Sequence, residues 1–253
     1  DDNGRAYLVF IHLYAKKGQP GKEYWSLCWK YSDDGGATWE STNDDQIVIS
    51  EKLKNDQFDI AADKPWLTCD RTDDIAFKDN LYVAYLKVDR DKNDTYIAFK
   101  QKTNWGSSFN VFPEINISGG IRDVHFPTMT TDRENNIYIA FVSNVYERAQ
   151  SLWYSKSSDG GTTFNPPEKI TDLYLPEAIN GIKQERLYAA PQIKVGYSKD
   201  GKKRVYVTYT ASGVRSSTST QSDVYLVRSK SDSPIIWDLP NRRSQDQKAL
   251  QHI

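Results

Sequence analysis

The sequence lacks features that would place it in several other classes of protein. No apolar run approaches the roughly 20 residues that a membrane-spanning helix requires. The net charge is −1, and the Lys and Arg residues are scattered rather than gathered into a basic surface for nucleic acid. We therefore expect neither insertion into a membrane nor binding to nucleic acid.

Cysteine and histidine are also scarce. Cys28 and Cys69 permit at most one internal disulfide, and two free thiols are the favoured interpretation. A zinc site needs more ligands than these cysteines and His12, His125 and His252 offer. We expect no metal and no cofactor.

One charged stretch invites a calcium interpretation. "DRDKNDT" (89–95) alternates acidic and amide side chains like the first half of a calcium-binding loop. Its sixth position is Asp94 rather than Gly, and its twelfth is Lys100 rather than Glu. We interpret it as a charged hairpin tip.

What the sequence does contain favours β-strands. The 253 residues are 38% apolar, which is enough for a sizeable core, and 13% aromatic, with sixteen Tyr and seven Trp. Abundant Tyr, Thr and Val with a single Met favour strands over helices. No sustained 3.6-residue apolar period is present, so the prediction is nearly all β.

An internal repeat organises the chain. Four strand-like segments begin with tyrosine and follow polar turns, namely "YLVF" (7–10), "YVAY" (82–85), "YIAF" (138–141) and "YVTY" (206–209). A second strand follows each, and a third element precedes the last three, around Pro65, Pro127 and Pro191. A shorter fourth strand, such as "QIVIS" (46–50), completes the pattern.

Four antiparallel strands per repeat of roughly 55–75 residues predict the blades of a β-propeller. The expected fold class is all-β, a single domain over 1–253 whose blades span about 1–58, 59–118, 119–182 and 183–253. The sequence begins on a second-strand pattern. Two interpretations stay open: the C-terminal tail completes the first blade, or the chain is part of a larger six- or seven-bladed ring, which is favoured.

An acid–glycine turn follows the second strand in the first and third repeats. Its two copies are "SDDGGATW" (32–39) and "SSDGGTTF" (157–164). Neither has the alternating acids of a calcium loop or the lysine and following helix of a phosphate loop. A structural turn explains every shared position, because side-chain oxygens bond backbone amides and glycines allow positive φ. The shared residues are Ser32, Asp34, Gly36, Thr38 and Trp39 in the first copy, and Ser157, Asp159, Gly161, Thr163 and Phe164 in the second.

The pattern Ser-x-Asp-x-Gly-x-Thr-Trp after a strand resembles the Asp box, or BNR repeat, of sialidase-like propellers. "DKPWLTCD" (63–70), followed by "YVAY", also resembles secreted BNR-repeat proteins. The resemblance implies that the turns lie on the outer part of each blade, away from a central active site. For a sialidase it implies three arginines, a tyrosine nucleophile assisted by Glu, and an Asp acid/base.

The sialidase residues are not found at the implied positions. No Arg-Ile-Pro tripeptide occurs, and Lys64, Phe126 and Ala190 precede the three prolines. Residues at the starts of the inner strands are instead the candidates for ligand binding, although solvated loop charges would give the same pattern. They are Asp63, Lys64, Arg122, Asp123, His125, Arg186 and Tyr188, with Asp63 and Asp123 as the best-placed carboxylate pair for a glycosidase.

Two functions from different classes follow. The leading prediction is a non-catalytic, exported propeller at the cell surface or outside the cell, which binds a glycan or a surface protein. Assembly with further blades or subunits is compatible with it. The alternative is an exo-α-sialidase with part of its active site outside this chain.

Overall fold

The structure is a computed structural model, and almost every regular element in it is a strand. The only helical segment among its described residues is a 3₁₀ turn, η2 (Phe109–Val111). The described residues are 4–15, 23–40, 47–52, 62–89, 93–103, 108–176, 189–199, 201–214, 222–232 and 235–242.

The strands form four antiparallel sheets, in which neighbours in sequence pair with each other. The first sheet contains β1 (Ala6–Ala15), β2 (Glu23–Ser32) and β3 (Ile47–Lys52). The second contains β4 (Ala62–Cys69), β5 (Leu81–Asp89), β6 (Asp94–Lys102) and β7 (Ile115–Asn116). The third contains β8 (His125–Thr131), β9 (Ile137–Ser143), β10 (Ala149–Ser157) and β11 (Glu168–Tyr174). The fourth contains β12 (Gln192–Tyr197), β13 (Lys203–Ala211), β14 (Asp223–Asp232) and β15 (Ile235–Trp237), with β16 (Asn241–Arg242) also on β14.

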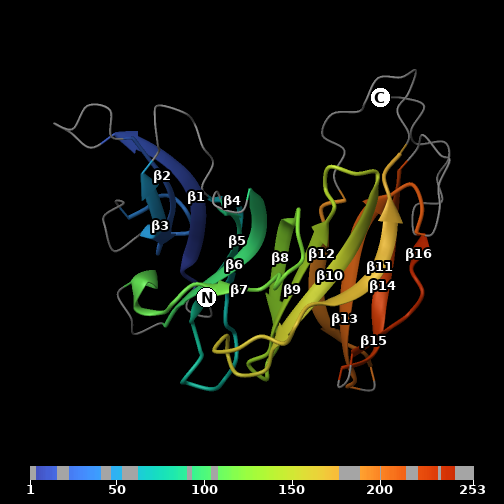
Figure 1. Cartoon of the computed structure of the whole chain (residues 1–253). Helices are drawn as coiled ribbons and strands as arrows, with labels where there is room; N and C mark the ends of the chain where they lie inside the picture. The colour runs from blue at the N-terminus through green and yellow to red at the C-terminus, as the bar shows by residue number, and fades with distance from the viewer. Residues whose placement is uncertain are drawn as a thin grey trace.

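Successive sheets pack face to face with their leading strands adjacent. Strand β8 contacts β4 on one side and β12 on the other, and β1 contacts β4. Figure 1 shows the sheets following one another in chain order, from the blue β1–β3 sheet to the orange and red β12–β16 sheet. This arrangement is a partial β-propeller. The all-β prediction of four-stranded antiparallel blades is confirmed, with three strands described in the first blade.

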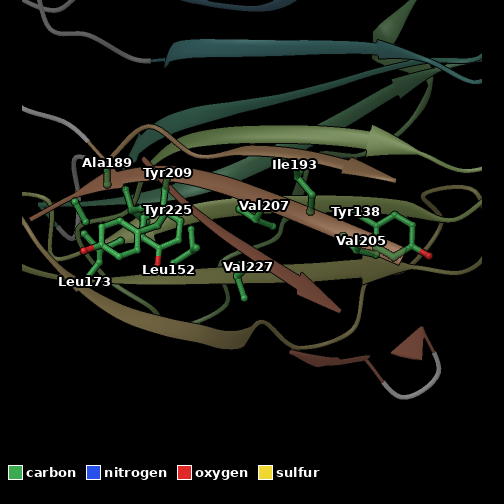
Figure 2. Close-up of a cluster of buried hydrophobic side chains, with 13 residues drawn as sticks. Tyr138, Leu152, Leu173, Ala189, Ile193, Val205, Val207, Tyr209, Tyr225 and Val227 are labelled. Atoms are coloured by element: carbon green, nitrogen blue, oxygen red, sulfur yellow. The ribbon is translucent and has the colours of Figure 1, made fainter. Parts of the chain in front are cut away.

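A separate hydrophobic core fills each interface between sheets. The core between the third and fourth sheets contains side chains from β9, β10, β11, β12, β13 and β14. Figure 2 shows Tyr138 at one end of this core, Ile193 and Val207 in the middle, and Tyr209 beside Tyr225 at the other end. The last two rings stack at 5.7 Å. Strand β9 is buried on both faces: Tyr138, Ala140 and Val142 belong to this core, and the alternate residues Ile137, Ile139 and Phe141 belong to the core shared with the second sheet. The alternation of side chains along one buried strand therefore joins consecutive blades.

In the last three repeats, an aromatic residue that follows the third strand of the sheet packs on the preceding sheet. Three edge-to-face ring contacts share this geometry, namely Phe109 on Trp29 at 6.2 Å, Phe164 on Phe99 at 4.9 Å and Trp237 on Tyr154 at 5.1 Å. Trp39 differs, since 38% of its surface is exposed. Among the described residues no sheet lies on that side of β1–β3, so packing of Trp39 into a blade is not observed.

The two acid–glycine turns have the same hydrogen bonds. The Ser32 hydroxyl donates to Asp34 at 2.7 Å and accepts the Gly36 N–H at 2.8 Å. Asp34 also accepts the Thr38 N–H at 2.8 Å and the Thr38 hydroxyl at 2.6 Å. In the second turn the Ser157 hydroxyl donates to Asp159 and accepts the Gly161 N–H, both at 2.8 Å. Asp159 accepts the Thr163 N–H at 2.9 Å and the Thr163 hydroxyl at 2.6 Å. Every polar side chain of the motif is thus used to satisfy the turn itself.

We expect Asp159→Ala to lower the free energy of unfolding by about 1 kcal/mol, because it removes acceptors for the amide and hydroxyl of Thr163. Burial alone would raise the pKa of Asp159, but hydrogen bonds from Thr163 and Ser157 outweigh it and lower this pKa. The stabilisation is therefore present above the ordinary carboxyl pKa and is lost as the pH falls through the lowered value. Urea denaturation measures it, with Ser158→Ala as the control.

Candidate functional site

The strands β4 and β8 both begin with a bulge next to a proline. The pairing register shifts between Asp63 and Trp66 on β4, and between His125 and Thr128 on β8. Proline has no N–H for the ladder, so pairing is interrupted there. A bulge changes the direction in which the neighbouring side chains point and is common beside binding sites.

The residue before each of these prolines has a strained backbone. Lys64 has φ of 49° and Phe126 has φ of 55°, in the left-handed region that glycine normally occupies. The two bulges meet, since the Lys64 ammonium lies 5.3 Å from the centre of the Phe126 ring. Two equivalent bulges on adjacent blades thus lie side by side at the starts of the inner strands.

A cleft of about 500 Å³ opens above these bulges. We call it the inner cleft. Its walls come from the starts of β4 and β8 and from the β5–β6 and β9–β10 connections, with Leu86 and Val88 as apolar lining. Its principal polar and aromatic residues are Asp63, Lys64, Asp94, Asp123, His125 and Tyr146.

The inner cleft is acidic, because it is lined by three carboxylates and one ammonium group. Both carboxylate oxygens of Asp63 bind Lys64, one to its backbone N–H at 2.7 Å and the other to its ammonium at 2.5 Å. The side chains of Lys64 and Asp63 are 31% and 22% exposed, and their ion pair orients two residues of the cleft. Asp123 adds a further negative charge to the lining.

Asp94 acts as an acceptor that joins two blades. One oxygen accepts the N–H groups of Thr95 at 2.7 Å and Asp123 at 3.2 Å. The other accepts from Nε of Arg122 at 2.9 Å. The end of the β5–β6 hairpin is thereby tied to the segment that leads into β8, which fixes one wall of the cleft.

His125 and Tyr146 form the aromatic part of the inner cleft. The two rings meet edge to face with centres 6.0 Å apart, and 74% of the Tyr146 surface is exposed. Burial, reinforced by the positive charge of Lys64, lowers the pKa of His125 to about 4. The imidazole is therefore neutral at physiological pH.

The lowered pKa of His125 makes the stability of the fold depend on pH. An unfolded histidine binds a proton near pH 6.5, whereas the folded one does so only near 4. We therefore expect the free energy of unfolding to fall as the pH drops from about 6.5 to about 4. Denaturation curves across this range test it, because His125→Gln should remove that part of the slope, and an unchanged slope would contradict it.

The structure brings together four of the residues predicted from the sequence, Asp63, Lys64, Asp123 and His125. Arg122 lies beside this cleft rather than in it, with its side chain 68% exposed and paired with Asp94. Arg186 and Tyr188 fall outside the described residues. The acid–glycine turns lie at the end of the sheets opposite the inner cleft. Ser157, where the second turn begins, pairs with Ile137, and Ile137 pairs with Thr131. Thr131 is the last residue of β8, whereas His125 of the cleft is the first.

Two of the principal polar and aromatic residues of the inner cleft were not predicted from the sequence. Tyr146 lies between β9 and β10, where a tyrosine next to charged residues carries no repeat signal. Asp94 was assigned to a charged hairpin tip, and its contacts with the segment before β8 depend on how the blades pack. One signal in the sequence could have indicated both residues. In an antiparallel blade, the β5–β6 and β9–β10 connections lie at the same end as the starts of the inner strands.

The described residues give little support for a cysteine nucleophile or a metal site. Cys28 and Cys69 are both free, and burial raises the pKa of each thiol to about 11, so they are poor nucleophiles. No cluster of three His, Cys, Asp or Glu side chains is found among the described residues. The described segments also contain no helix with the length and apolar character needed to cross a bilayer.

No protein-family model matches this sequence, and no curated protein matches it either. Several solved structures align with low similarity. An endo-1,4-β-xylanase from Bacteroides thetaiotaomicron has 14% identity and a TM-score of 0.44, over 94% of this chain and 76% of the xylanase. An α-L-arabinanase from Penicillium chrysogenum has 11% identity and a TM-score of 0.47, over 92% and 66%. The Hadza microbial sialidase Hz136 has 12% identity and a TM-score of 0.41, over 85% and 44%. These values are too low to assign an activity to this chain.

Proposed function

We propose that this protein is a glycan-binding propeller whose inner cleft binds a neutral sugar without cleaving it. The observation that carries the proposal is the exposed Tyr146 ring, fixed against His125 in the same cleft as the carboxylates of Asp63 and Asp123. An aromatic face suits the apolar side of a sugar ring, and carboxylates accept hydrogen bonds from its hydroxyl groups.

The charge of the inner cleft favours a neutral glycan over a sialylated one. Its one ammonium group, on Lys64, is already bound by Asp63, and Asp123 contributes a further negative charge. A sugar carboxylate entering this cleft would meet like charge, which disfavours its binding. Within the proposal, the protein belongs to the sialidase-like Asp-box propellers and acts outside the cell or at its surface, and the repeated hydrogen-bonded turns support that membership.

Tyr146→Ala is expected to weaken binding of a neutral oligosaccharide about tenfold, because it removes the stacking surface. A glycan array that contains neutral, sialylated and sulfated glycans identifies the probe, and isothermal titration measures its affinity. Tyr197→Ala is the matched control, since Tyr197 is also exposed, at 47%, and lies at the end of β12, outside the inner cleft. Equal losses in both variants, or preferential binding of sialylated glycans, would refute the proposal.

Glycan hydrolysis is a second candidate function, favoured by one observation. Asp63 and Asp123 line the same cleft, as a two-carboxylate mechanism requires. Against it, both oxygens of Asp63 are already bonded to Lys64. Release of reducing ends from a bound neutral oligosaccharide, abolished in Asp123→Asn, would establish hydrolysis in place of simple binding.

A further inference from the structure

A second and larger cleft, of about 780 Å³, adjoins the inner cleft. We call it the outer cleft. The two clefts share Asp94 and Thr95 as lining residues, and the Arg122–Asp94 ion pair lies where they meet. The outer cleft continues from there over β6 toward β7, at the outer edge of the second sheet.

The wall of the outer cleft is held rigidly by hydrogen bonds. Glu114 accepts the hydroxyl of Tyr96 at 2.7 Å and also that of Tyr85. Asn116 accepts the Ser118 hydroxyl and the Gly119 N–H, each at 3.1 Å. The cleft is therefore largely formed before any ligand binds, which lowers the cost of binding.

The lining of the outer cleft combines apolar surface with directional polar groups. Tyr96 and Ile121 supply the apolar part, and Asn116 and Arg122 supply the polar part. Arg122 uses Nε for Asp94, so its two terminal nitrogens take no part in that bond and can donate to a ligand. This composition suits a sugar unit as well as the inner cleft does.

We propose that the ligand is an extended oligosaccharide that occupies both clefts, with its chain passing over Asp94 and Thr95. The inference rests on the proposed function, because it assumes that the inner cleft binds one end of the glycan. It adds that the outer cleft binds further sugar units and that Arg122 contacts those units alone. The affinity for an oligosaccharide then rises with its number of sugar units. Binding of any oligosaccharide still requires the inner cleft.

Gly120 offers a way to block the outer cleft without disturbing the fold. It lines the outer cleft but not the inner one, and a Cβ built on it meets no atom within 4 Å. Gly120→Tyr should therefore fold normally and fill the cleft, and Gly120→Ala is the matched control. Thermal unfolding of both variants checks that the fold is retained.

The test uses isothermal titration with cello- and xylo-oligosaccharides from the disaccharide to the hexasaccharide. We expect the wild type to bind the hexasaccharide at least about tenfold more tightly than the disaccharide. Gly120→Tyr should lose this gain and keep its disaccharide affinity, Arg122→Ala should lose part of it, and Gly120→Ala should match the wild type.

Two results would overturn the inference while leaving the proposed function intact. One is equal affinity of the wild type for short and long oligosaccharides, together with weaker binding of both by Tyr146→Ala. The other is undiminished hexasaccharide binding by Gly120→Tyr. If Tyr146→Ala has no effect on any oligosaccharide that binds, the proposed function itself fails, and this inference fails with it.

Discussion

Replacing Lys203 with methionine is expected to lower the free energy of unfolding by about 3–5 kcal/mol. Lys203, at the start of β13 in the fourth sheet, donates to Asp132 after β8 in the third sheet at 2.9 Å and to Glu134 at 2.7 Å. The side chains of Lys203 and Asp132 are 5% and 0% exposed. Methionine keeps the apolar stem but leaves the buried Asp132 carboxylate without its cation, which is a costly state.

The pKa shifts of the pair define the pH range over which it stabilises the fold. Burial alone would raise the pKa of Asp132 and lower that of Lys203, but their hydrogen bonds reverse both shifts. The contribution of Asp132 is lost only as the pH falls through its lowered pKa, and that of Lys203 only as the pH rises through its raised pKa. The pair is therefore effective across the neutral range.

A surface ion pair provides the control for Lys203→Met. Lys169 and Asp172 are 3.0 Å apart but 46% and 51% exposed, so Lys169→Met should cost less than about 1 kcal/mol. Guanidinium denaturation of both variants at neutral pH gives the comparison. If Lys203→Met cost no more than Lys169→Met, the buried pair between the third and fourth blades would contribute no more to stability than a surface pair, and the prediction would be wrong.

Gly161→Ala is expected to destabilise the protein by about 2–4 kcal/mol, whereas Gly36→Ala should cost about 1–2 kcal/mol. The two glycines occupy the same position of the acid–glycine turn, with φ of 88° and 93°, so alanine is similarly strained at both. Their surroundings differ. A Cβ on Gly161 would lie 2.8 Å from Cζ of Phe99, whereas one on Gly36 would meet only Trp39, at 3.8 Å.

The difference between these variants isolates the contact between blades. Phe99 is fully buried and packed between Tyr82 and Phe164, so its ring cannot move away from an added methyl group without disturbing its neighbours. Thermal or chemical denaturation of both alanine variants measures the difference. Equal losses would show that the second turn is held by its own hydrogen bonds alone and not by packing on the second sheet.

Local sequence patterns were sufficient for the fold class. The repeated tyrosine strands, the prolines before the inner strands and the acid–glycine turns all reflect local constraints, namely the alternation of side chains along a strand, a missing amide donor and positive φ. The structure contains antiparallel sheets built from those segments, in that order. The two acid–glycine turns have nearly identical hydrogen bonds because every bond lies within one short segment.

The candidate site could be only partly predicted, because it forms where different blades meet. Asp63, Lys64, Asp123 and His125 were identified by their place at inner-strand starts, and they line one cleft. The role that we propose for Tyr146 and the proposed extension of the site past Asp94 depend on contacts between segments far apart in the sequence.

The sequence by itself therefore determined the strands, the turns and the repeat, since each follows from hydrogen bonding and side-chain alternation within a few tens of residues. Tertiary structure decided how each copy of a motif is packed and where clefts open between the blades. Phe164 is packed on Phe99 while Trp39 is 38% exposed, although both close the same turn. The physical reason is that packing and clefts arise from the surface of the neighbouring sheet, which no single repeat encodes.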